Sequence, residues 1–94
     1  MSGLTLVYWR DIPAQVTQGK GRNATRVILT ERFEQAIDRA AMKAGLAGTD
    51  DYLNQWRRAP VEGDDPQAEA ARLEAEYDKD RLKAIIANDG WNPV

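Results

Sequence analysis

The hydrophobic period of the chain changes near residue 30, and this change limits the folds that the chain can adopt. Before this point, β-branched and aromatic residues form short runs in which side chains alternate between two faces, which is typical of strands. After it, apolar residues recur at spacings of three and four, which is typical of amphipathic helices. We therefore predict an α+β fold in which a sheet formed by the N-terminal third packs against the helices that follow.

Three segments predict the strands of an antiparallel sheet, at about residues 4–10, 14–18 and 25–29. Pro13 is expected to interrupt the pairing between the first two, because proline has no N–H to donate. The segment 19–23 contains two glycines and an asparagine, which favour a turn. The simplest topology is a meander in which the strands pair in chain order.

Three helices are predicted after the strands, at about residues 31–44, 50–57 and 66–88. Thr30 is expected to cap the first helix through its hydroxyl. An aspartate followed by proline at 65–66 is a strong signal for the start of the last helix. The last helix has only a thin apolar stripe, so the sequence is compatible with both a monomer and a homodimer.

The chain length of 94 residues is that of one small domain, which we assign to residues 1–94 with an internal loop at 60–65. No apolar run approaches the roughly 18 residues that a membrane-spanning helix needs. The first residues carry no basic region and no cleavage signal. We therefore expect a cytoplasmic protein with no membrane partner.

Two residue types are missing, and their absence excludes most catalytic chemistry. Without cysteine there is no disulfide, no thiolate nucleophile and no cysteine-based metal site. Without histidine there is no serine–histidine–aspartate triad, and the commonest ligand of transition metals is lacking. We expect a protein that is not an enzyme, with no catalytic residue, no metal and no cofactor.

Charge is divided unequally along the chain. Residues 1–45 hold seven basic and four acidic residues, whereas residues 46–94 hold six basic and eleven acidic ones. A sheet that carries basic and aromatic side chains can bind single-stranded nucleic acid. The isoelectric point of about 5.1 argues against this, because nucleic-acid-binding domains are usually basic. Lys20 and Arg22 lie in a glycine-rich turn, where their side chains would either bind a small anion or be solvated.

A further cluster of candidate binding residues consists of Trp56, Arg57 and Arg58. A tryptophan flanked by arginine has the composition of an interface hot spot. The same residues also fit a core tryptophan at a helix end, where arginine is favourable beside the negative terminus. The sequence leaves both interpretations open.

The runs at residues 6–16 (LVYWRDIPAQV), 31–42 (ERFEQAIDRAAM) and 56–58 (WRR) resemble a family of small bacterial proteins labelled virulence factor, found mainly in proteobacteria. The resemblance covers residues 4–91. In longer relatives this domain sits beside a domain similar to the N-termini of iron–sulfur scaffold proteins, which implies an adaptor or regulatory part. The family defines no catalytic residue, so none is carried over. For stand-alone members, the resemblance implies a link to corrinoid- and folate-dependent methyl transfer.

These observations favour a non-enzymatic interaction or regulatory module that binds a protein partner. The alternatives are nucleic-acid binding through a basic sheet face, or an accessory subunit of an enzyme of one-carbon metabolism. The polar and aromatic positions of the shared motifs are the candidate binding residues: Trp9, Arg10, Asp11, Gln15, Lys20, Trp56 and Arg57.

Overall fold

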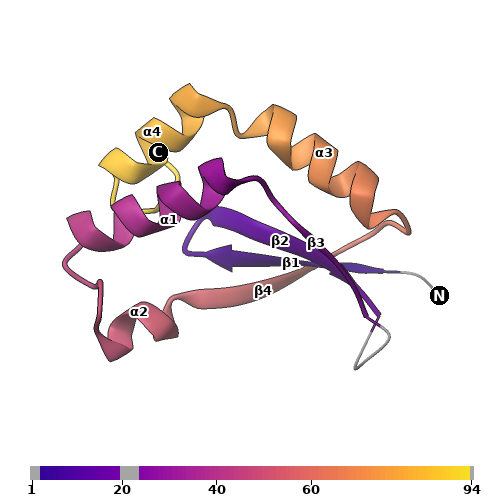
Figure 1. Ribbon diagram of the computed structural model, residues 1–94, viewed down its shortest axis with the longest axis horizontal. Coiled ribbons are helices and arrows are strands. Elements are labelled where there is room, and N and C mark those ends of the chain that lie inside the picture. Colours follow the sequence, from indigo (N-terminus) through magenta and orange to yellow (C-terminus); the bar gives the residue numbers. More distant parts are fainter. Residues whose placement is uncertain (1–2, 20–23, 94) are drawn as a thin grey trace.

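The computed structural model describes residues 3–19 and 24–93. Within them the chain forms one four-stranded antiparallel sheet and four helices (Figure 1), so the predicted α+β class is confirmed. The elements follow in chain order as β1 (Leu4–Trp9), β2 (Ile12–Gln18), β3 (Thr25–Ile28), α1 (Glu31–Lys43), α2 (Asp50–Asn54), β4 (Trp56–Val61), α3 (Pro66–Glu76) and α4 (Lys79–Ala87). No helix in these two stretches is long and apolar enough to cross a membrane.

The sheet has the strand order β3-β2-β1-β4, so the predicted meander of the first three strands is confirmed. The central strands β1 and β2 contain no charged residue, as expected for strands that are covered on one face and paired on both edges. Leu6 pairs with Val16 of β2 on one side and with Ala59 of β4 on the other. This register places the three apolar side chains on the same face of the sheet.

The prediction of three strands is wrong, because the segment from Trp56 to Val61 forms a fourth strand along β1. The helix predicted over 50–57 is correspondingly limited to α2, and the loop predicted over 60–65 begins only after Val61. Two arginines and Pro60 resemble the end of a helix in the sequence. They are equally suited to an edge strand, where charged side chains and a missing N–H are tolerated.

The single helix predicted over 66–88 is two helices, separated at Tyr77 and Asp78. The backbone of Tyr77 leaves the helical conformation (φ −99°, ψ 71°), and its side chain is buried. The carboxylate of Asp78 then accepts a hydrogen bond from the backbone N–H of Arg81 at 2.8 Å. Asp78 therefore caps a new helix and lets the chain change direction while its apolar side chains stay in the core.

The hydroxyl of Thr30 does not cap α1, so this prediction is also wrong. It lies 2.8 Å from Oε1 of Glu74 in α3, and the backbone N–H of Thr30 donates to Oε2 at 2.7 Å. Arg32 adds an ion pair to the same carboxylate at 3.2 Å. A partner on another helix thus replaces the local cap, and it fixes the start of α1 against α3.

The remaining boundaries differ from the prediction by one or two residues. Pro13 lies within β2 rather than before it, next to a bulge between the pairs Val7–Gln15 and Tyr8–Pro13. In the structure β1 ends at Trp9, β2 begins at Ile12, β3 ends at Ile28 and α1 ends at Lys43.

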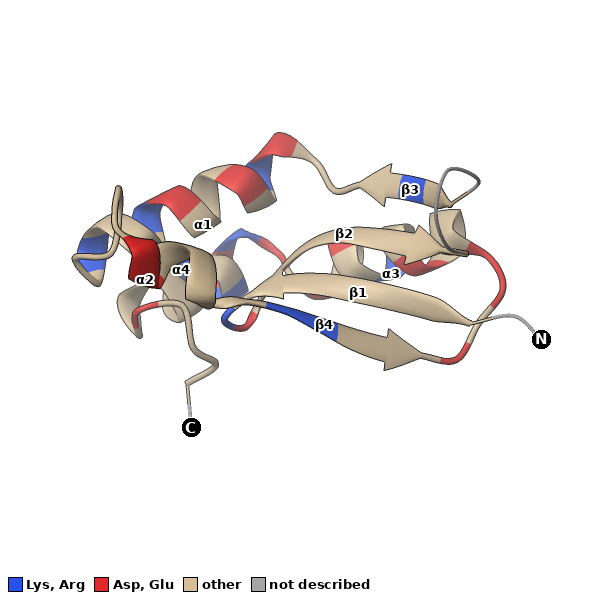
Figure 2. Cartoon of the chain, turned by 90° about the horizontal axis from the view of Figure 1, so that it is seen from below, with Lys and Arg blue, Asp and Glu red and all other residues tan. Residues whose placement is uncertain are grey.

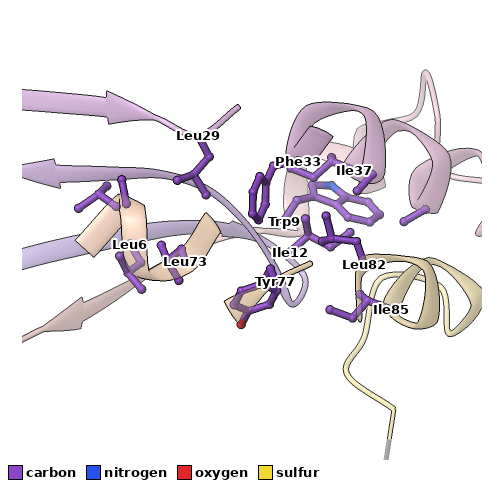
Figure 3. Packing of buried hydrophobic residues seen from close by; sticks show 14 of the residues in the cluster. Leu6, Trp9, Ile12, Leu29, Phe33, Ile37, Leu73, Tyr77, Leu82 and Ile85 are labelled. Carbon is purple, nitrogen blue, oxygen red and sulfur yellow. The ribbon is translucent and has the colours of Figure 1, made fainter. Parts of the chain in front are cut away.

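The core lies between the sheet and the helices, and Figure 3 shows it as two adjoining groups. Under α3, Leu6 and Leu73 pack together with Leu29. At the turn between β1 and β2, Trp9 lies close to side chains of α1 and α4. The apolar residues of α1 that recur at spacings of three and four include four that are buried, as that pattern predicts: Phe33, Ile37, Ala40 and Ala41.

Candidate functional site

Arg10, at the turn between β1 and β2, is held between two tryptophans. Its guanidinium carbon lies 5.2 Å from the ring centroid of Trp9 and 5.1 Å from that of Trp91. Its Nε donates to the side-chain oxygen of Gln55 at 3.2 Å, and Nη1 donates to the carbonyl of Asp89 at 2.6 Å. The guanidinium is therefore used within the chain, where it fastens the segment after α4 to the turn.

Asp11 and Arg57 extend this network. Oδ1 of Asp11 accepts from Arg57 at 3.0 Å, and Oδ2 accepts from the backbone N–H of Asn92 at 2.7 Å. Arg57 also donates from Nε to the carbonyl of Arg10 at 2.9 Å, and it stacks over Tyr8 at 4.3 Å. The structure thus brings together three of the candidate binding residues, because Arg57 donates hydrogen bonds to both Arg10 and Asp11.

Trp9 belongs to the core, because its side chain is 0% exposed. Its indole N–H donates to the carbonyl of Tyr52 at 2.9 Å, and the two rings lie 5.5 Å apart. No part of this ring reaches the surface, so a partner could not contact it in the folded protein. Lys20 and Arg22, with the anion proposed there, lie outside the described residues.

One face of the sheet, onto which Figure 2 looks, is not covered by α3, whereas α1 and α2 line a hollow at its end near Gln15, Ile28 and Trp56. The strand register gives the residues on this face, because directly paired residues point to the same side. We call it the open sheet face, and its residues are Thr5, Val7, Gln15, Thr17, Arg26, Ile28, Trp56, Arg58 and Pro60. The register also pairs Trp9 with Trp56, but Trp9 is fully buried and is not counted in this face.

Trp56 is the large aromatic residue of the open sheet face, and it is 36% exposed. It lies between two hollows of about 270 Å³ each. One hollow is formed with Val7 and Arg58, and the other with Gln15 and Ile28 among its lining residues. Ile28 is 72% exposed at the far edge. Gln15 and Trp56 are thus the two candidate residues that open onto this face.

The charges on the open sheet face are positive. Arg26 on β3 and Arg58 on β4 lie at its two edges, on either side of the uncharged central strands (Figure 2). None of the nine residues that form this face is acidic, but Glu34 and Asp38 of α1 line the hollow that contains Gln15 and Trp56. The face therefore combines exposed apolar groups with positive charge at its borders.

The pKa shifts that the structure produces arise from packing and ion pairing. Burial raises the pKa of Tyr8, Tyr52 and Tyr77 above the usual tyrosine value. A hydrogen bond from Arg72 lowers the pKa of Glu69. These shifts move both kinds of group away from neutral pH, where a proton-transfer catalyst would need to titrate. In the described stretches, no three acidic side chains are grouped as a metal ion would require.

We expect the free energy of unfolding to be nearly constant between about pH 6 and 9, because the chain has no histidine or cysteine side chain to titrate there. Above about pH 10 it should fall, since tyrosines in the unfolded chain ionise before the buried ones. The raised pKa values of Tyr8 and Tyr77 mean that their contribution is complete below the unfolded value and is lost as pH rises through the folded one.

Urea unfolding at a series of pH values measures this dependence, with tyrosine ionisation followed by absorbance. Tyr77→Phe removes one ionisable group from the core and should make the alkaline decline shallower than in the wild type. A steep change in stability between pH 6 and 9 would contradict the expectation.

Another hollow, on the helical side of the protein, was not identified from the sequence. It lies between α1 and α4, and basic residues of both helices line it. The signal was present as basic residues at helical spacing, such as Arg32 with Arg39 and Lys79 with Lys83. These residues form one basic site only because α1 and α4 are neighbours in the fold, and the spacing of residues within one helix does not predict which helices are neighbours.

Comparison with known proteins gives one match. A protein-family model described as "Virulence factor" matches residues 7–86. No curated protein and no solved structure matches the chain. The matched segment runs from the second half of β1 into α4, so it contains the turn with Arg10 and Asp11 and most of the open sheet face.

Proposed function

This chain belongs to the virulence factor family, and we propose that it is a non-enzymatic interaction module that binds a protein partner through its open sheet face. The observation that carries this proposal is the position of Trp56. Its side chain is 36% exposed and lines two hollows, one between β1 and β4 and one that α1 and α2 also line. Tryptophan beside arginine is the composition most enriched in interface hot spots.

The surroundings of Trp56 also support an interface. Val7, Ile28 and Pro60 add apolar surface to the open sheet face, and Arg26 and Arg58 border it. An apolar centre with a polar rim is the usual arrangement of a protein–protein interface. The absence of histidine and cysteine from the sequence supports the non-enzymatic part of the proposal.

The double variant Trp56→Ala, Arg58→Ala tests the proposal by affinity capture from a lysate of the producing cells. We expect one protein to be captured by the wild type and to bind the variant about 30-fold more weakly, as for loss of a hot-spot residue. The matched control is Met42→Ala, Leu53→Ala, which removes two 64%-exposed apolar residues outside this face. The control should capture the same protein as the wild type.

Equal capture by the wild type and the Trp56 variant would contradict the proposal. Circular dichroism and urea unfolding of both variants establish that they remain folded. If the captured protein is an enzyme of one-carbon metabolism, the chain is an accessory subunit of that enzyme.

Nucleic-acid binding is the second candidate, because Arg26 and Arg58 share the open sheet face with an exposed aromatic ring. Cations that neutralise phosphates beside a ring that stacks on bases would suit a single strand. Binding of a labelled single-stranded oligonucleotide at low salt, with an affinity that falls steeply as salt is added, would favour this function. The same measurement on the Trp56 variant assigns such binding to the face.

A further inference from the structure

The hollow between α1 and α4 has a volume of about 460 Å³, larger than either hollow beside Trp56. We call it the α1–α4 groove. Three apolar residues contribute to its lining: Ala36 from α1, and Leu82 and Ile86 from α4. Four basic residues and one amide complete it: Arg32, Gln35, Arg39, Lys79 and Lys83.

Helical spacing places the four cations around the groove. Arg32 and Arg39 are seven residues apart on α1, which is two turns, and Lys79 and Lys83 are one turn apart on α4. Like charges one turn apart destabilise a helix slightly, so the lysine pair does not help α4 to form. The stability of α4 therefore does not account for the two lysines that face the groove.

Three of these four cations have no ion pair within the described part of the protein. Arg39, Lys79 and Lys83 form no ion pair with any described residue, and no residue that lines the groove is acidic. Arg32 pairs with Glu74, yet its Nε is buried without a hydrogen-bond partner. A groove with a positively charged lining thus lies on a chain whose net charge is −2.

We propose that the α1–α4 groove binds an acidic segment of a protein partner, with carboxylates against the basic residues and an apolar side chain against Ala36, Leu82 and Ile86. Charge complementarity selects the acidic partner. The lining holds no aromatic ring on which a base could stack, which favours a peptide over nucleic acid. This site is separate from the open sheet face and shares no residue with it, so it stands whether or not that face binds a partner.

A generic acidic peptide tests this chemistry directly. The probe is a synthetic peptide of glutamate and leucine, compared with the peptide in which lysine replaces every glutamate, each titrated into the ¹⁵N-labelled full chain at low salt. We expect the acidic peptide alone to shift amide signals, with the largest shifts at Gln35, Ala36 and Leu82. The shifts should shrink as salt is added.

The charge-reversal variant Arg39→Glu, Lys83→Glu should bind the acidic peptide about tenfold more weakly or worse, since two exposed attractions become repulsions. Neither residue has an ion pair within the described structure, so the fold should persist, and the amide spectrum reports this. The matched control is Arg26→Glu, Arg58→Glu, which makes the same change in net charge on the open sheet face. It should bind the peptide like the wild type.

Three results would overturn the proposal. The first is no shift with the acidic peptide, and the second is an equal loss of binding in both charge-reversal variants, which would indicate attraction by net charge alone. The third is tighter binding of a single-stranded oligonucleotide than of the peptide in this groove, which would assign the groove to nucleic acid.

Discussion

Replacing Trp9 with alanine is expected to lower the free energy of unfolding by about 3–5 kcal/mol, the usual cost of removing a large buried aromatic side chain. The indole is 0% exposed and packs at the point where the turn between β1 and β2 meets α1 and α4. Its N–H also donates to the carbonyl of Tyr52, so the change removes a hydrogen bond as well as a packed ring. A small domain has only about 5–15 kcal/mol in total, so the variant will be marginal.

Urea unfolding of Trp9→Phe and Trp9→Ala separates the two losses. Phenylalanine keeps an aromatic ring but has no N–H donor, so Trp9→Phe should retain much of the stability that Trp9→Ala loses. If Trp9→Ala cost less than about 1 kcal/mol, the tight packing of this ring would be contradicted.

The burial of Trp9 also decides which residue can test binding. Any loss of a partner in a Trp9 variant would reflect unfolding, whereas Trp56 is exposed and can be removed without opening the core. The sequence places both tryptophans in shared motifs and cannot separate their roles. The separation comes from their strands: the two residues pair directly, but Trp9 lies on the central strand β1 and is fully buried, whereas Trp56 lies on the edge strand β4 and is 36% exposed.

The local patterns were sufficient to predict the first three strands and α1, because each depends on the spacing of side chains within one element. The fourth strand could not be predicted in this way. Only its pairing with β1 makes it a strand, and that pairing joins Tyr8 to Arg57 across 49 positions of sequence.

The same limit applies to the residues around Arg10. The motif with Arg10 and Asp11 was identified, but their partners Trp91 and Asn92 lie some 80 residues away. Nothing in the spacing of a short motif specifies contacts with the end of the chain. In the structure, the side chains of Arg10 and Asp11 contact residues of the C-terminal segment and hold it against the turn between β1 and β2.

Gly90 of that segment packs against Trp9 and Arg10. Gly90→Ala is expected to cost about 2–4 kcal/mol, from backbone strain and from overpacking. Its φ is +96°, a conformation that residues with a side chain rarely adopt. A Cβ here would lie 2.9 Å from Cζ3 of Trp9 and 3.1 Å from Cδ of Arg10. The carbonyl of Gly90 also accepts from the N–H of Asp11 at 2.8 Å, so the glycine cannot move away without losing this bond.

Two other glycines separate the causes of this loss. Gly45 has a φ of +76° with nothing within 4 Å of a Cβ, so Gly45→Ala should show the backbone strain alone, about 1 kcal/mol. Gly3→Ala has neither strain nor a close neighbour and should be nearly neutral. Urea unfolding should therefore rank the three variants with Gly90→Ala well below Gly45→Ala. Equal losses at Gly90 and Gly45 would mean that the contact with Trp9 adds nothing, and that the C-terminal segment is not packed against the turn as described.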